Sequence, residues 1–134
     1  MRLEINNVTK DKINTKILKK GAVVFSRRMK LNNKAVSVAF VSGQRIRSLN
    51  KRYRKINKVT DILSFAGEGE FLGELIICYP QIRRQAKQAG NKIKDELLFI
   101  FIHGLLHLVS YDDTTKKGYK EMMELGKKIS KSII

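Results

Sequence analysis

The sequence predicts a single domain of the α+β class, in which a small mixed sheet of about four strands packs with about five helices. Short segments rich in β-branched and aromatic residues alternate with longer segments whose apolar residues recur at helical spacing. The expected strands cluster early and in the middle of the chain, and its last third is helical. With 134 residues, 43% of them hydrophobic, the chain suits one domain over residues 1–134.

The N-terminal part is expected to hold two strands and two helices. Residues 2–6 could form a short strand, and residues 35–41 alternate apolar and smaller residues as a second strand does. Between them we expect a helix from residue 9 to about residue 30, with Thr9 as its N-cap and Asp11 in its first turn. Its inner stripe is expected to be Ile13, Ile17 and Val24. A short helix should follow over residues 44–54.

The C-terminal part is expected to hold two strands and three helices. Residues 61–65 and 72–78 read as strands around a turn at residues 67–69, and they could pair as a hairpin or pair elsewhere. Pro80 suits the first turn of a helix that Gly90 would end. The next helix begins near residue 91 and is almost wholly apolar over residues 97–109. A last helix from about residue 115 is expected to bury Tyr119, Met122, Met123 and Ile129.

The charge of the chain indicates a polyanionic partner. Lys and Arg total 28 against 12 Asp and Glu, which gives a formal net charge of +16. Binding of basic residues to phosphates releases condensed counterions, so nucleic acid is the leading candidate and an anionic membrane surface is the alternative. Many single lysines are expected only to be solvated.

Other features of the sequence favour the cytoplasm. The longest apolar stretch, residues 97–109, falls short of the roughly 20 residues that a membrane span needs. The N-terminal residues lack the apolar core of a signal peptide. The lone cysteine, Cys78, cannot form an intramolecular disulfide, which suits a reducing compartment.

Two histidines mark a candidate metal site at the end of the central buried helix. His103 and His107 lie four residues apart on a helix, so both imidazoles project from one face and can bind one ion. The helix should end soon after, which lets Asp113 or Asp112 bring a carboxylate to the same ion. Two histidines and one carboxylate leave positions open for water and substrate, as in catalytic sites. A histidine pair at this spacing could instead be two satisfied polar residues in a core.

Gly104 argues against one kind of metal site. A metalloprotease of the H-E-x-x-H type carries its glutamate general base at this position. The glycine removes bulk between the two histidines, which permits close packing of the helix or access to the metal. A small metalloprotease is therefore disfavoured, also by the basic charge.

A basic block, residues 49–65, lies upstream of the histidines. Its lysines and arginines flank Tyr53 on both sides, and such a pattern suits contacts to phosphates and stacking on a base. A charge run of this kind is also typical of a solvated loop.

These segments together resemble the YbeY family of bacterial single-strand endoribonucleases, which are linked to maturation of ribosomal RNA and to ribosome quality control. The family signature H-G-x-L-H-L-x-G-Y-D-H appears as H-G-L-L-H-L-V-S-Y-D-D over residues 103–113. The upstream family pattern, L-N-x-x-Y-R followed by T-D-V-L-S-F, resembles L-N-K-R-Y-R over residues 49–54 and T-D-I-L-S-F over residues 60–65. The resemblance covers most of the chain from about residue 35 onward.

The resemblance implies a metal-dependent endoribonuclease that acts on single-stranded RNA, with ribosomal RNA as substrate and small-subunit ribosomal proteins as further partners. It implies one zinc ion, or another divalent metal, bound by His103, His107 and Asp113. It also implies that Arg54 is the catalytic basic residue facing the metal pocket. The alternative is a non-catalytic RNA-binding factor of ribosome assembly with a structural metal.

Two positions depart from the family signature. Ser110 replaces a glycine, so the turn after the helix must accept a Cβ atom, which disfavours a positive φ. Asp113 replaces the third histidine. A carboxylate is a competent zinc ligand, but its negative charge weakens the metal as a Lewis acid and shifts preference toward manganese or magnesium.

Overall fold

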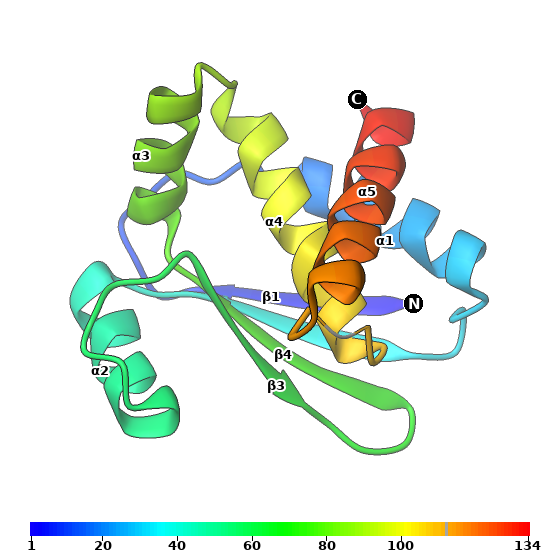
Figure 1. Cartoon of the computed structure of the whole chain (residues 1–134), viewed down its shortest axis with the longest axis horizontal. Helices are drawn as coiled ribbons and strands as arrows, with labels where there is room; N and C mark the ends of the chain where they lie inside the picture. Colours follow the sequence, from blue (N-terminus) through cyan, green and yellow to red (C-terminus); the bar gives the residue numbers. More distant parts are fainter. Residues whose placement is uncertain (112) are drawn as a thin grey trace.

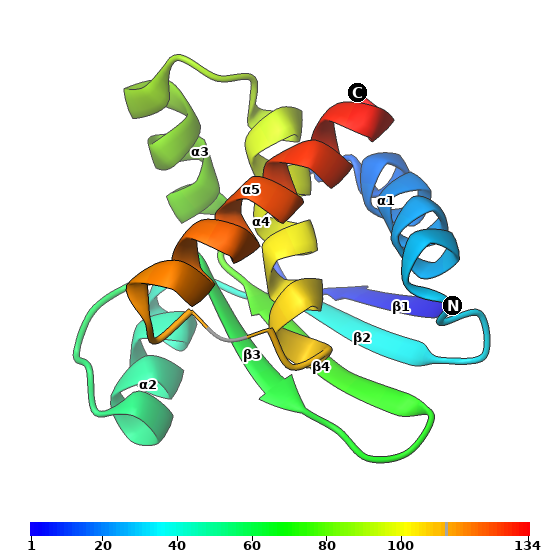
Figure 2. The same cartoon turned by 45° about the vertical axis from the view of Figure 1, so that its right-hand side comes forward.

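A computed structural model, which describes residues 1–111 and 113–134, shows one α+β domain with four strands and five helices in those residues (Figures 1 and 2). The elements are β1 (Arg2–Asn7), α1 (Thr15–Met29), β2 (Ala35–Phe40), α2 (Gly43–Arg54), β3 (Ile62–Ala66), β4 (Phe71–Ile77), α3 (Tyr79–Ala89), α4 (Ile93–Leu108) and α5 (Lys116–Ile133). The predicted class and the predicted numbers of strands and helices are confirmed.

The four strands form one mixed sheet in the order β1-β2-β4-β3. The pairs β1–β2 and β2–β4 are parallel, whereas β3 and β4 are antiparallel neighbours in the chain. The sequence did not decide whether these two strands pair with each other, and the structure shows that they form a hairpin. It places β3 at an edge of the sheet, and this edge borders the candidate site.

Helices α1, α3, α4 and α5 lie on one side of the sheet, and α2 lies on the other (Figure 1). The main core includes the fully buried Val38, Phe40 and Phe101, where strand residues of one face meet α4. Burial of one such side chain contributes about 1.5–3 kcal/mol, so the apolar run of α4 is explained by packing. A smaller cluster around Ile46 and Ile76 joins α2 to the opposite face. None of the described helices is both long and apolar enough to cross a membrane.

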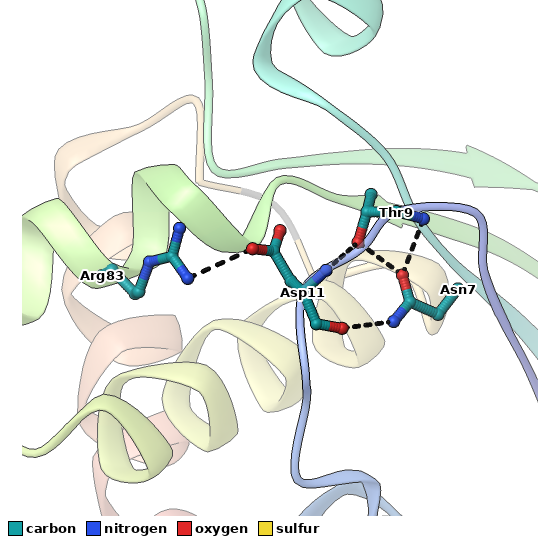
Figure 3. A network of polar contacts seen from close by, with 4 residues as sticks. All are labelled: Asn7, Thr9, Asp11 and Arg83. Atoms are coloured by element: carbon teal, nitrogen blue, oxygen red, sulfur yellow. Dashed lines mark hydrogen bonds and ion pairs between the residues drawn. The ribbon is translucent and has the colours of Figure 1, made fainter.

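The prediction that Thr9 caps the first helix is wrong. Thr9 belongs to a turn in which its N–H and hydroxyl donate to Asn7 Oδ1 (3.0 and 2.6 Å) and its Oγ1 accepts the N–H of Asp11 (3.2 Å) (Figure 3). The Asp11 carboxylate does not cap α1, but contacts Arg83 Nη1 on α3 at 3.2 Å. The local side-chain hydrogen bonds of Asn7 and Thr9 compete with helix formation, and helix α1 starts only after residue 14.

The inner stripe of α1 differs in part from the prediction. Asn14 is the N-cap, with its side chain accepting the N–H of Lys16 at 3.2 Å, so Ile13 precedes the helix. Ile17 is buried as predicted, but Ile13 and Val24 are only partly buried. The most buried apolar residues of α1 are Leu18, Ala22 and Phe25.

Helix α5 confirms two of its four predicted core residues. Met122 and Ile129 are buried, whereas Met123 is only partly buried. The prediction for Tyr119 is wrong, because this residue is 51% exposed. Tyr119 and Met123 share a helix face that lines a pocket, and the face that packs into the core continues through Met122, Ile129 and Ile133.

Candidate metal centre

The end of α4 brings the two histidines together. The His103 and His107 rings are half-buried, with their centroids 4.8 Å apart and their planes at 83°. Asp113, after the helix, completes a cluster in which one ligand atom from each residue lies within 4.8 Å of the others. The closest carboxylate contact is 3.3 Å, from His107 Nε2 to Asp113 Oδ2. The sequence-predicted ligands are therefore side by side, and the alternative ligand Asp112 lies outside the described residues.

A tight turn after α4 returns the chain toward the histidines. The N–H of Tyr111 donates to the carbonyl of Leu106 (3.1 Å), and the N–H of Ser110 donates to that of His107 (3.1 Å). This is the pairing of a Schellman motif, in which the residue after the C-cap is left-handed and most often glycine. Here it is Ser110, with φ of 75°. The strain expected at Ser110 is thus present in the segment that positions Asp113.

Gly104 lets α4 approach the sheet closely. A Cβ atom at this position would lie 2.6 Å from Ile62 Cδ1 and 3.0 and 3.1 Å from the two methyl carbons of Leu75. Of the two effects expected for this glycine, the structure shows close packing. Gly104 faces the sheet, and His103 and His107 lie beside it on the helix. Both imidazoles line the pocket together with residues of the edge strand β3.

The electrostatic surroundings of His103 favour a neutral imidazole. Burial lowers its pKa, and the neighbouring His107 lowers it further, whereas Asp113 and Asp61 act in the opposite direction. The buried Nδ1 of His103 has no hydrogen-bond partner in the described part of the chain. A neutral ring offers a lone pair to a metal, and a second imidazole and a carboxylate complete a donor set that suits zinc and other divalent transition metals. The residues present fit a metal ion.

A pocket of about 750 Å³ opens over the three candidate ligands. Its walls come from α4, from residues 60–65 along β3, from the start of α5 and from the end of α2. Arg54, the last residue of α2, is exposed and lines this pocket. The structure therefore brings together all four residues that the sequence singled out: His103, His107, Asp113 and Arg54.

The position of Arg54 depends on how α2 ends. Asn50 is 2% exposed and its Nδ2 donates to the carbonyl of Lys58 at 3.0 Å, which ties the helix to the following loop. Arg47 Nε donates to Asn57 Oδ1 at 2.9 Å and makes a second tie. Lys55, directly after Arg54, ends the helix in a left-handed conformation with φ of 59°.

Sequence reasoning missed several residues of the pocket. Asp61 lines it, and its Oδ2 accepts a hydrogen bond from Gln85 Nε2 at 3.2 Å. This aspartate lies within the T-D-I-L-S-F block, which could have indicated it. Phe99, one helical turn before His103, stacks on that ring with centroids 6.1 Å apart. Tyr119 also lines the pocket, and helical periodicity had assigned it to the core.

The fold and the site define a class: a small basic α+β protein with a potential His-His-carboxylate metal site in an open pocket beside an arginine. Comparison with known proteins specifies the class further. A family model described as "Endoribonuclease YbeY" matches residues 3–134. The chain belongs to the YbeY family.

Individual relatives support this membership. "Endoribonuclease YbeY" from Bacillus cereus (strain B4264) is 42% identical over 108 residues, which covers 70% of this chain and 69% of the relative. The protein of the same name from Bacillus thuringiensis (strain Al Hakam) is 41% identical over the same length and coverage. The solution structure of TM1509 from Thermotoga maritima is 29% identical and matches with a TM-score of 0.71, over 98% of this chain and 88% of that one.

Proposed function

We propose that this protein is a metal-dependent endoribonuclease that cleaves single-stranded RNA in the pocket beside α4. The observation that carries the proposal is that Arg54, from α2, lines the same pocket as His103, His107 and Asp113. Relatives named as endoribonucleases support it. By the same family membership we propose ribosomal RNA as the substrate, a role in its maturation and in ribosome quality control, and a cytoplasmic location.

Each residue of the site has a distinct role in this proposal. His103, His107 and Asp113 hold one divalent ion, with zinc as the first candidate and manganese or magnesium favoured more by the carboxylate than by a third histidine. Such an ion supplies Lewis-acid chemistry to a phosphodiester. The Arg54 guanidinium binds the same phosphate and stabilises the negative charge that develops on its oxygens during cleavage.

The charge distribution supports an RNA substrate. Residues 12–60 contain no Asp or Glu, and they include α2 with its exposed Arg45, Arg52 and Arg54. The exposed cations of α2 attract a polyanion and concentrate it near the pocket. Because α2 ends at the pocket wall, the backbone of a bound strand would be led toward Arg54.

The test combines metal analysis with RNA cleavage. Nuclease-free protein should contain a divalent metal and cut an end-labelled single strand faster than the matching duplex. The variant His103→Ala should lose both metal and cleavage and keep most of its RNA affinity. Cleavage by His103→Ala at the wild-type rate would overturn the proposal.

Arg54 is tested separately, against a control on the same helix. Arg54→Ala should retain its metal and lower the cleavage rate about a hundredfold, the size of effect expected when a group that stabilises the transition state is removed. Arg45→Ala removes an equal charge from an exposed position of α2 outside the pocket and should change the rate far less.

Asp113 also supports a second candidate function. In this alternative the protein is a non-catalytic assembly factor that binds ribosomal RNA or a ribosomal protein, and its metal serves only the structure. The carboxylate in place of the family's third histidine is the observation that favours it. The variant Asp113→His separates the two functions. An enzyme weakened by its natural ligand should cleave faster with histidine, whereas a pure binding protein should gain no cleavage.

A further inference from the structure

Two exposed tyrosines line the candidate pocket from different parts of the fold. Tyr53 of α2 is 56% exposed and Tyr119 of α5 is 51% exposed. Helix α2 lies on one side of β3 and α5 on the other (Figure 1). The candidate metal ligands His103, His107 and Asp113 line the same pocket, so this pocket receives one tyrosine from a helix on each side of β3.

The ring of Tyr53 is held by its neighbours while much of it stays open to solvent. It makes an edge contact with Phe65 of β3, with centroids 5.2 Å apart and planes at 76°. The Arg52 guanidinium carbon lies 5.4 Å from its centroid in a cation–π contact. A ring fixed in this way loses little conformational entropy when a flat ligand stacks on it, and the arginine is placed to meet a phosphate beside that ligand.

Tyr119 is fixed mainly by its backbone. It lies in the first turn of α5, where Thr115 Oγ1 accepts the N–H of Gly118 at 3.0 Å and the carbonyl of Thr115 accepts that of Tyr119 at 2.9 Å. Met123, one helical turn further, lines the same pocket and is partly buried. A capped helix start thus fixes the backbone of Tyr119 at the pocket, although its side chain is not part of the core.

Both tyrosines are surrounded in the sequence by exposed cations. Lys51, Arg52 and Lys55 lie near Tyr53. Lys116, Lys117 and Lys120 lie near Tyr119. Alternation of aromatic rings and cations is the chemistry of single-strand nucleic-acid grooves, in which bases stack on the rings and phosphates contact the cations.

We propose that Tyr53 and Tyr119 are base-stacking residues on the two sides of the metal cluster, and that they give the site its preference for unpaired RNA. This inference rests on the proposed function for the identity of the strand. A base in a duplex is already stacked and paired, so neither ring can reach its face without breaking the helix. An unpaired base can turn out onto Tyr53 or Tyr119, which stretches the backbone between them across the metal cluster and Arg54.

The experiment measures binding in the His103→Ala background, where cleavage does not disturb the equilibrium. The probes are a short fluorescent single-stranded RNA and the duplex of the same sequence, followed by anisotropy. We expect Tyr53→Ala and Tyr119→Ala each to raise the Kd for the single strand about 5- to 150-fold, the range for loss of one stacked base. The Kd for the duplex should not change.

Two kinds of control variant separate stacking from other effects. Tyr53→Phe and Tyr119→Phe keep the ring and should bind like their parent, which excludes a role of the hydroxyl groups. Phe71→Ala removes an aromatic side chain that is 43% exposed but lies outside the pocket, and it should have no effect. Thermal unfolding midpoints of all variants verify that they are folded.

A set of RNA probes with one abasic site at successive positions makes the assignment specific. If Tyr119 stacks on a particular base, the penalty of Tyr119→Ala should vanish on the probe that lacks that base, and the same should hold for Tyr53→Ala at another position. A penalty that is equal on every probe would show that the ring acts without stacking and would overturn the assignment.

The proposal is also wrong if both alanine variants bind the single strand as tightly as their parent, if the duplex weakens equally, or if the parent shows no preference for the single strand. None of these measurements needs cleavage. A wild-type protein without nuclease activity would therefore overturn the proposed function alone, and normal cleavage with unchanged binding would overturn the stacking alone.

Discussion

His107 Nε2 lies 3.3 Å from Asp113 Oδ2, although one residue belongs to α4 and the other follows the turn after it. Both side chains are about one third exposed, with values of 31% and 32%, and they meet at the wall of the pocket. A carboxylate in this position can share an ion with the imidazole. The contact supports Asp113 as the third ligand of the proposed metal site.

The first prediction concerns Asp113. Asp113→Asn keeps the size of the side chain and removes its charge, so the affinity for a divalent metal should fall by more than the roughly 10–100-fold that loss of an outer partner of a ligand costs. Competition with a chromogenic chelator measures this change. Glu121→Gln removes a carboxylate outside the pocket, on an exposed part of α5, and should leave the metal affinity unchanged. Equal affinities for Asp113→Asn and wild type would remove Asp113 from the site.

The second prediction concerns the strained turn. Ser110 has a φ of 75°, a conformation that costs an L-residue about 1–2 kcal/mol and glycine almost nothing. Because glycine also gains entropy in the unfolded chain, Ser110→Gly should raise the free energy of unfolding by a net amount of about 1 kcal/mol. Urea denaturation measures this gain.

Two variants control the prediction for Ser110. Ser110→Ala retains a Cβ atom and should show no such gain. Lys30 has a φ of 57° after α1, far from the pocket in the chain, so Lys30→Gly should gain stability without a change in metal affinity. Loss of stability in both glycine variants would show that the left-handed residues are not strained.

Much of the candidate metal site follows from the sequence because its parts are local. Helical spacing alone places His103 and His107 on one face of the helix. Asp113 follows His103 by only ten residues, so a turn directly after the helix is enough to bring its carboxylate back to the histidines. The position of Arg54 in the same pocket does not follow from local spacing, because only the tertiary fold brings the end of α2 to α4. In the sequence, only the resemblance to the family connects Arg54 with the histidines.

The errors have physical causes of the same kind. The amphipathic pattern of the last helix assigned Tyr119 to the core together with Met122, Met123 and Ile129, but periodicity does not show which neighbour covers a helix face. Here the neighbour is the pocket. Near the N-terminus, Thr9 is a residue type that often caps a helix. Its hydroxyl group instead forms hydrogen bonds with Asn7 and Asp11 in a turn before the helix.

The third prediction compares two glycines in the interior of helices. Gly104→Ala would place a Cβ atom 2.6 Å from Ile62 Cδ1, and such overpacking costs about 1–3 kcal/mol, more than the helix propensity gained from alanine. At Gly126 the nearest atom is Phe99 Cε2 at 3.4 Å, so Gly126→Ala should be neutral or stabilising. Urea denaturation should show a lower free energy of unfolding for Gly104→Ala and an unchanged or higher one for Gly126→Ala. Equal stability of the two variants would contradict the close packing of α4 on the sheet.

The last prediction concerns Cys78, which is fully buried beside α2 and the sheet. Burial raises the pKa of its thiol above the usual value and outweighs the lowering by the backbone of Gln81 and by Arg84. The thiolate is the reactive form, so alkylation at neutral pH should be slow in the folded protein and rapid in urea. Mass spectrometry over time measures both rates. Because the pKa is higher in the folded than in the unfolded chain, the stability that this thiol contributes at neutral pH is lost as the pH rises above the usual pKa of a thiol. Alkylation of the folded protein at the rate of the unfolded chain would show that Cys78 is accessible.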